Sequence, residues 1–128
     1  MLIPKSKLYV KDNSGVLIAQ CIKVHKSKKS QKPCKIGDSL KATIKKHSKK
    51  SQQVTKKVNS STQLRDLVII QTKKSLRRLD GSALRFNTNC GVTINSRKQP
   101  LFKRITTVVP LELKKGCISV VNLAKAVI

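Results

Sequence analysis

The chain contains very few acidic residues: Asp and Glu account for 5 of its 128 residues, against 29 Lys and Arg, so the formal net charge is +24. A compact chain with such an excess of positive charge repels itself and attracts a polyanion. No apolar run approaches the ~20 residues that a membrane-spanning helix needs, and no amphipathic surface helix is evident. These absences favour nucleic acid over a membrane as the partner.

Patterns that support catalysis or metal binding are missing as well. General acid–base catalysis needs a positioned pair of titratable groups, but the five acids are single and far apart, four at predicted turns or loop ends and one at a helix start. The glycines are isolated, which argues against a Gly-rich phosphate loop. The four cysteines form no CxxC pair, and both histidines lie in Lys-rich segments, so neither zinc nor a disulfide framework is expected. The sequence predicts a protein of a reducing compartment that is not an enzyme and holds no metal or cofactor. An enzyme acting on RNA through convergence of distant residues is an alternative.

Aromatic residues are also scarce: there are Tyr9, Phe86 and Phe102, and no Trp. Proteins that bind single strands without sequence preference stack bases on aromatic side chains, and none of these three residues lies in a cluster of basic residues. Phe86 alternates with Leu84 and is predicted to pack in the core. The composition therefore favours binding to folded RNA through backbone phosphates and shape.

Apolar residues nevertheless make up 38% of the chain and are clustered, which is typical of a folded protein. Short apolar and alternating runs bounded by Gly and Asp turns predict strands, at 8–10, 16–24, 40–45, 67–71, 82–86, 91–95 and 118–123. Between the last two, Pro110 at a first helical position and Gly116 as a stop predict a short helix. The expected fold is mainly β, an open or closed barrel with one small helix.

The strand pattern also predicts the core and the loops. One domain spanning residues 1–128 is expected, with basic loops at 25–35 and 46–66. The predicted core residues, mostly at alternating positions, are Val16, Ile18, Leu40, Ile44, Val68, Ile70, Leu84, Phe86, Val92 and Ile94.

Several segments resemble a known family. They include DNSG at 12–15, CIKV at 21–24, IGDSLKATIK at 36–45 and TKKSLRRLDGSALRFNTNCGV at 72–92, the last of which is highly specific. Along essentially its whole length the chain resembles the universal L-fourteen family of large-subunit ribosomal proteins. It departs from the family pattern in having Ser75 where Gly is usual and Leu79 where Pro is usual. Of the segment 102–109 it retains Arg104, Ile105 and Val109.

The resemblance implies a small five-stranded β-barrel with a short helical C-terminal part, and a structural role in translation. The implied partners are large-subunit rRNA, neighbouring large-subunit proteins, small-subunit rRNA across an intersubunit bridge and, in bacteria and organelles, a ribosome silencing factor. The excess of Lys with Ser and Asn looks like a mitochondrial member of fungal type, so the mitochondrial matrix is the expected location. Bacterial cytoplasm and plastid are the alternatives.

The stretch 72–86 has the highest density of candidate RNA contacts, because it packs five cations around an Asp80-Gly81 turn. Without the resemblance, a solvated loop explains this charge equally well. The turn is expected to be closed by Asp80 and Gly81, anchored by Ile70 and Phe86, and independent of the Arg77 and Arg78 side chains. With the resemblance, the predicted RNA-binding residues are Lys23, Lys41, Lys45, Lys73, Lys74, Arg77, Arg78, Arg85, Lys103 and Arg104. The alternative function is a free-standing basic RNA-binding regulator or chaperone.

Overall fold

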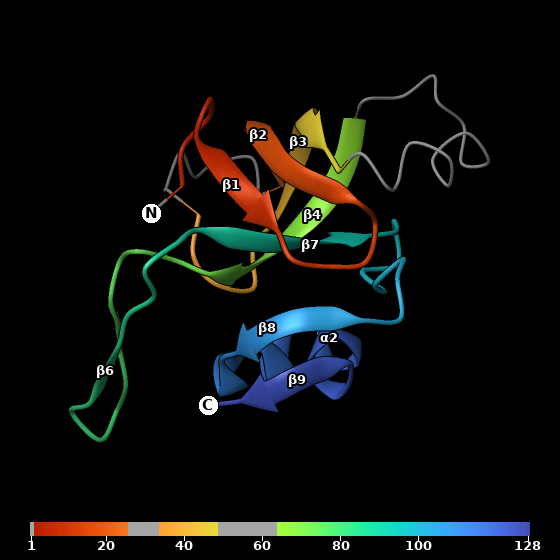
Figure 1. The fold of residues 1–128 in the computed structure, drawn as a ribbon. Coiled ribbons are helices and arrows are strands. Elements are labelled where there is room, and N and C mark those ends of the chain that lie inside the picture. The colour runs from red at the N-terminus through yellow and green to blue at the C-terminus, as the bar shows by residue number, and fades with distance from the viewer. Residues whose placement is uncertain (1, 26–33, 49–63) are drawn as a thin grey trace.

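A closed barrel of five strands forms the main body of the computed structural model, which describes residues 2–25, 34–48 and 64–128 (Figure 1). Its strands are β1 (Lys7–Val10), β2 (Val16–Val24), β3 (Ser39–His47), β4 (Leu64–Gln71) and β7 (Cys90–Ile94). Pairing is antiparallel from β1 through β4 to β7, and a parallel pairing of β7 with β1 closes the ring. Closure leaves the barrel without an open edge strand. The predicted mainly β fold with a five-stranded barrel is confirmed.

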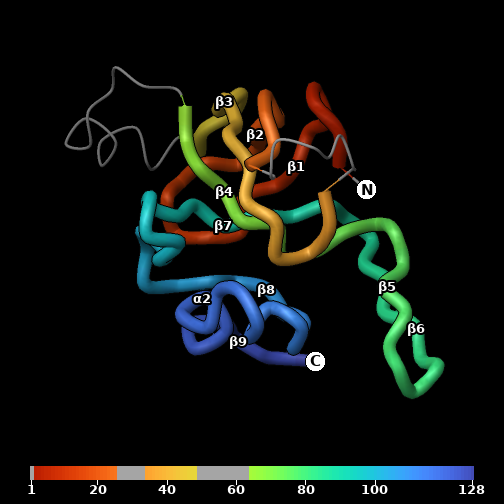
Figure 2. The backbone as a smooth tube through the Cα atoms, turned by 180° about the vertical axis from the view of Figure 1, so that it is seen from behind, coloured from red at the N-terminus to blue at the C-terminus, as the bar shows by residue number. Residues whose placement is uncertain are grey.

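A two-stranded hairpin projects from the barrel between β4 and β7 (Figures 1 and 2). Its strands are β5 (Leu76–Arg77) and β6 (Ala83–Leu84), paired antiparallel. The strand predicted at 82–86 is therefore shorter than expected, because the chain leaves the hairpin after Leu84 to re-enter the barrel. We call residues 72–86 the basic arm.

The C-terminal residues form a separate small layer under the barrel (Figure 1). It contains β8 (Ile105–Val109), the 3-10 helix η2 (Leu111–Lys115), the α-helix α2 (Ile118–Asn122) and β9 (Ala124–Val127). Strands β8 and β9 pair in parallel, which requires a crossover connection, supplied here by the two short helices. None of the helices among the described residues has the length and apolarity to cross a membrane.

Two predictions for this C-terminal layer are wrong, and two of its strands were not predicted. The stretch 118–123 is mostly α2, with Val120 and Val121 both buried, and not a strand, because a short apolar run fits a buried helix as well as a buried strand. Pro110 is extended and directly precedes η2, whereas Gly116 does end it. Strands β8 and β9 were not predicted.

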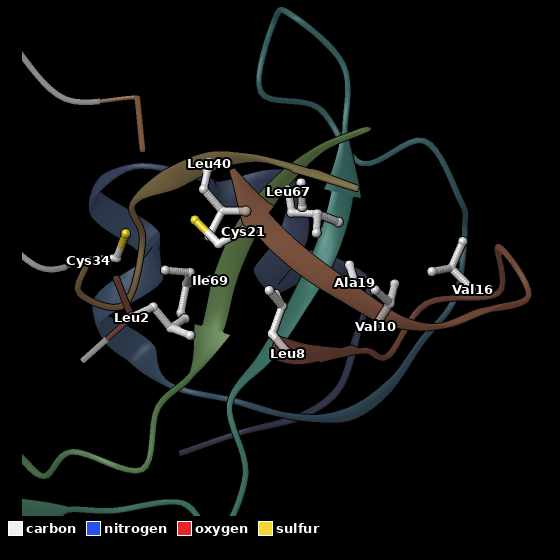
Figure 3. Close-up of a cluster of buried hydrophobic side chains, with 11 residues drawn as sticks. Leu2, Leu8, Val10, Val16, Ala19, Cys21, Cys34, Leu40, Leu67 and Ile69 are labelled. Atoms are coloured by element: carbon white, nitrogen blue, oxygen red, sulfur yellow. The ribbon is translucent and has the colours of Figure 1, made fainter. Parts of the chain in front are cut away.

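Buried apolar side chains form two clusters. One fills the barrel interior and includes Leu8, Leu40, Leu67 and Ile69 (Figure 3). The other joins β4 and β7 to the C-terminal layer and includes Val68, Ile70, Val92, Ile94, Ile105, Val109, Leu113 and Val120. Strand β4 thus contributes alternate residues to each cluster and is covered on both faces, which explains its continuous apolar sequence.

Six of the ten predicted core residues are buried: Val16, Leu40, Val68, Ile70, Val92 and Ile94. Ile18 and Ile44 are half-buried, although Ile44 packs against the barrel cluster. Leu84 and Phe86 are also half-buried and belong to neither cluster. Their prediction as core residues is wrong, because the arm carries them away from the barrel.

The two basic loops are shorter than the predicted ranges 25–35 and 46–66. The loop over 46–66 is wrong at both ends, since β3 continues to His47 and β4 begins at Leu64. Within the loop over 25–35, Cys34 is buried and its N–H donates to the Leu2 carbonyl oxygen at 2.9 Å. The remaining loop residues, 26–33 and 49–63, lie outside the described residues.

Candidate nucleic-acid interface

The tip of the basic arm is a tight turn whose shape follows from its sequence. The N–H of Gly81 donates to the Arg78 carbonyl oxygen at 3.2 Å, and the N–H of Arg78 donates to the Ser82 carbonyl oxygen at 2.9 Å. Gly81 has φ +85°, a left-handed conformation that Gly adopts at little cost. Asp80 accepts hydrogen bonds from both the N–H and the hydroxyl of Ser82. This is a three-residue hairpin loop with its Gly at the left-handed position.

The base of the basic arm is fixed to the barrel by hydrogen bonds. The N–H of Lys73 donates to Asn89 Oδ1 at 2.9 Å, and the N–H of Phe86 donates to the Thr72 carbonyl oxygen at 3.2 Å. Arg85 Nε donates to the Lys73 carbonyl oxygen at 3.1 Å. The arm is therefore a projection with a held base and a defined tip.

Four of the five predicted cations of the arm face solvent. Lys73, Lys74, Arg77 and Arg85 are exposed, and within the part of the chain that the structure describes none of them forms an ion pair. The one acid of the arm, Asp80, is occupied by Ser82, and these hydrogen bonds hold the pKa of its carboxyl below the usual range. The positive charge of the arm is thus available to a partner.

Arg78 differs from the other cations of the arm because it is already bound. Its Nε donates to Glu112 Oε1 at 2.6 Å and an Nη donates to Glu112 Oε2 at 3.2 Å and to the Ile128 main-chain oxygen at 2.9 Å. The hydrogen bond with Glu112 raises the pKa of Arg78 and lowers that of Glu112. Arg78 therefore ties the arm to the C-terminal layer. The turn is closed by Asp80 and Gly81 as expected, but the anchoring of the arm through the Arg78 guanidinium group was not predicted.

Strands β2 and β3 contribute a second group of predicted cations. Lys23 and Lys41 are exposed and stand directly opposite each other in the β2–β3 register, and Lys45 is exposed further along β3. Like charges in directly opposite positions destabilise a sheet. A polyanion bound to this surface would relieve the repulsion between the two lysines. The predicted cationic outer face of β3 is confirmed.

The last two predicted cations lie far from the basic arm. Lys103 and Arg104 are exposed in the segment between β7 and β8. Figures 1 and 2 both show this segment and the arm on opposite sides of the molecule. The ten predicted residues therefore do not form one cluster.

Two acids have structural roles that the sequence did not reveal. Asp12 Oδ2 accepts the N–H of Thr93 at 2.9 Å and also its hydroxyl, while Asp12 Oδ1 accepts the N–H and hydroxyl of Ser14. Asp12 thus joins the β1–β2 turn to β7. Asp66 lies within β4, where Oδ1 is 3.3 Å from His25 Nε2, so its assignment to a loop end is wrong.

The described residues contain no group of three His, Cys, Asp or Glu side chains arranged to hold a metal ion. All four cysteines are buried, and burial raises the pKa of the thiols of Cys21, Cys90 and Cys117. A thiol with a raised pKa is a poor nucleophile and a poor metal ligand. These cysteines serve as small packing residues.

A groove of about 280 Å³ runs between the base of the arm and residues 34–36. Its lining includes Lys35, Lys74, Ser75 and Arg77, whose side chains are donors suited to a phosphate. Thr72 also lines the groove, but its hydroxyl already donates to the Lys74 carbonyl oxygen at 3.0 Å. Lys35 was not among the predicted RNA-binding residues. In the sequence it stands at the end of the predicted basic loop 25–35, just before the Gly37-Asp38 turn. The N–H of Lys35 donates to Asp38 Oδ2 at 2.7 Å.

The described residues thus form a small closed β-barrel that carries a basic arm and an exposed pair of cationic strands. The particular family is shown by comparison with family models. Residues 1–128 match the model described as Ribosomal protein L14p/L23e, so the chain belongs to that family. It is accordingly a protein of the large ribosomal subunit, from a family that is structural and not enzymatic. The family predicted from the sequence is confirmed.

Proposed function

We propose that the protein binds large-subunit rRNA through phosphate contacts and that the basic arm is its principal contact. The observation that supports this most directly is the exposure of Lys73, Lys74 and Arg77 on a projection whose base is fixed by hydrogen bonds. A preorganised arm loses little conformational entropy on binding, and each phosphate that it neutralises releases counterions. Lys23, Lys41 and Lys45 add a second contact surface on the barrel.

We also propose a place on the intersubunit face, in contact with small-subunit rRNA, neighbouring large-subunit proteins and a silencing factor. The segment between β7 and β8, which carries the exposed Lys103 and Arg104, lies on the opposite side of the molecule from the basic arm (Figure 1), and this supports the proposal. A protein whose arm is inserted in large-subunit rRNA would keep these cations exposed at the opposite side for a second RNA.

The proposed compartment is the mitochondrial matrix, on the basis of the Lys excess. Subcellular fractionation tests it, with bacterial cytoplasm and plastid as the competing results.

The experiment compares two charge-reversed variants of equal charge. Lys74→Glu with Arg77→Glu changes the basic arm, and Lys114→Glu with Lys125→Glu changes two exposed cations of the C-terminal layer. Neither pair includes Arg78, so the tie to Glu112 stays intact. We expect the arm variant to lose incorporation into the large subunit in a density gradient while keeping the wild-type circular dichroism. Loss of two phosphate contacts should also reduce the log–log salt slope of rRNA binding by about two.

Wild-type incorporation of the arm variant would contradict the phosphate-contact role of the arm. An equal loss in both variants would indicate a general effect of charge rather than a site. Wild-type protein found in light fractions, and absent from large subunits at raised salt, would support a free-standing RNA-binding regulator instead.

A further inference from the structure

Strand β1 places the single tyrosine of the chain between two lysines on the outer face of the barrel. Side chains alternate along this strand, so Leu8 and Val10 are buried while Lys7 and Tyr9 are exposed. Lys11, the next residue of the same parity, brings its Nζ to 5.9 Å from the centroid of the Tyr9 ring. Lys7, Tyr9 and Lys11 therefore form one surface, which we call the β1 platform.

Apart from the contact of its ring with Lys11, the Tyr9 side chain forms no hydrogen bond, ion pair or ring contact among the described residues. The residue is 48% exposed, and its hydroxyl has no hydrogen-bond partner among the described residues. Neither Lys7 nor Lys11 forms an ion pair in the described part of the chain. The acid closest in sequence, Asp12, is occupied by Ser14 and Thr93. An exposed aromatic ring between unneutralised cations is the arrangement by which proteins hold an unpaired nucleotide.

The β1 platform is directly connected to the base of the basic arm through Asn89. The main-chain oxygen of Asn89 accepts the N–H of Tyr9 at 2.9 Å, and its side-chain Oδ1 accepts the N–H of Lys73 at 2.9 Å. The main chains of Tyr9 and Lys73 are thus bound to the same residue, which places the β1 platform beside the base of the arm. Because two hydrogen bonds fix Asn89 to both sides, the spacing between the ring and the arm is set by the fold.

We propose that the β1 platform binds an unpaired nucleotide of RNA, with the base stacked on Tyr9 and the flanking phosphates held by Lys7 and Lys11. This rests on the proposed RNA-binding function and adds to it a contact with a base. From the sequence alone, no aromatic residue is placed in a cluster of basic residues. The proposal therefore gives Tyr9 a role that the sequence did not predict. The strand alternation brings the ring and the two lysines together on one face.

The test uses the emission of the full-length wild-type protein, because Tyr9 is its only tyrosine and there is no tryptophan. One probe is a single-stranded oligoadenylate of about twelve nucleotides, a length that covers a typical single-strand site. The other is inorganic polyphosphate of the same charge, which offers phosphates without bases. We expect oligoadenylate to quench Tyr9 emission on binding and polyphosphate to bind without quenching. Equal Tyr9 emission in the two complexes would overturn the proposal.

Variants separate stacking from charge. Tyr9→Leu should weaken oligoadenylate binding about tenfold, in the range found for one stacked base, and leave polyphosphate binding unchanged. Tyr9→Phe should keep the wild-type affinity for both probes. Ile22→Ala, which removes a similarly exposed apolar side chain from the neighbouring strand β2, should keep both the affinity and the quenching. A Tyr9→Leu variant with wild-type oligoadenylate affinity would also overturn the proposal.

These results are distinct from a failure of the proposed function. If oligoadenylate binds without quenching Tyr9 emission, the proposed role of the β1 platform is overturned, whereas the proposed phosphate binding by the basic arm still stands. A protein that binds neither probe, and an arm variant that incorporates like wild type, would overturn both.

Discussion

Arg78 Nε lies 2.6 Å from Glu112 Oε1, and this contact joins the basic arm to the 3-10 helix η2, 34 residues further along the chain. The carboxylate receives two N–H groups of the same guanidinium, a planar geometry that Arg favours over Lys. A pocket lined by Leu76, Leu79 and Lys115 separates the rest of the arm from the helix. Beyond the hydrogen bonds at its base, the arm is therefore held to the C-terminal layer by this ion pair and by the hydrogen bond from Arg78 to the Ile128 main-chain oxygen.

The first prediction concerns this tie. Arg78→Ala should free the arm from the C-terminal layer and speed hydrogen exchange at the N–H groups of the arm, because their local opening no longer breaks the ion pair. Arg77→Ala, which removes an exposed and unpaired neighbour, is the control and should leave the exchange unchanged. Arg78→Glu with Glu112→Arg should restore slow exchange. Identical exchange in the Arg78→Ala and Arg77→Ala variants would show that the ion pair does not hold the arm.

The second prediction is a pH dependence. Glu112 has a lowered pKa, chiefly because Arg78 donates to its carboxylate. A group with a lowered folded pKa contributes stability that is fully present above its unfolded pKa, about 4.3 for Glu, and is lost as pH falls through the lowered value. The NMR signal of the Arg78 Nε–H should therefore be constant at neutral pH and shift only at pH values below the ordinary pKa of Glu. Glu112→Gln should abolish this titration. A signal that titrates at the ordinary pKa of Glu would contradict the pairing.

A third prediction concerns the seam where β7 meets β1. A Cβ added to Gly91 would lie 2.8 Å from Leu8 Cδ1 and 3.1 Å from the Val68 main-chain oxygen, so Gly91→Ala should cost about 1–3 kcal/mol of unfolding free energy. Gly116→Ala is the matched control, since its Cβ would meet nothing within 4 Å and its φ is −128°. That change should be neutral or stabilising by about 0.5 kcal/mol. Urea unfolding of both variants measures the difference, and similar values would contradict the close packing at the seam.

A fourth prediction separates core from arm. Ile70 is fully buried in the cluster under the barrel, so Ile70→Ala should cost about 2–5 kcal/mol, as large-to-small changes in packed cores do. Leu84 is half-buried on the arm, so Leu84→Ala should cost about 1 kcal/mol or less. Thermal and urea unfolding compare the two. A larger loss for Leu84→Ala would mean that the arm packs against the barrel more closely than its exposure indicates.

Local patterns in the sequence predicted much of this architecture. Alternation along β3 identified Leu40 and Ala42 as inward and Lys41 and Lys45 as outward, because neighbouring side chains of a strand point to opposite faces. The Asp80-Gly81 turn predicted the tip of the basic arm, because Gly at a left-handed position is a local requirement. The five cations of the arm could also be identified from the sequence, but not that one of them, Arg78, is bound within the protein.

Features that join distant segments could not be found in this way. The pairing of Arg78 with Glu112, the hydrogen bonds from Thr93 to Asp12 and the apposition of Lys23 and Lys41 each depend on strand register or on the packing of the C-terminal layer. Leu84 and Phe86 were misassigned because a hairpin that leaves the barrel has the same alternation as one that stays in it.

The sequence by itself determined the excess of positive charge, the positions of most strands, the turn of the basic arm and the family, because these depend on composition and on residues close together in the chain. Only the tertiary structure decided which cations are available and which are bound, that β4 is covered on both faces, and that Tyr9 stands exposed between Lys7 and Lys11 beside the base of the arm. The physical reason is that burial and ion pairing depend on which surfaces meet. In this chain those surfaces come from segments far apart in sequence, brought together when the barrel closes and the C-terminal layer packs beneath it.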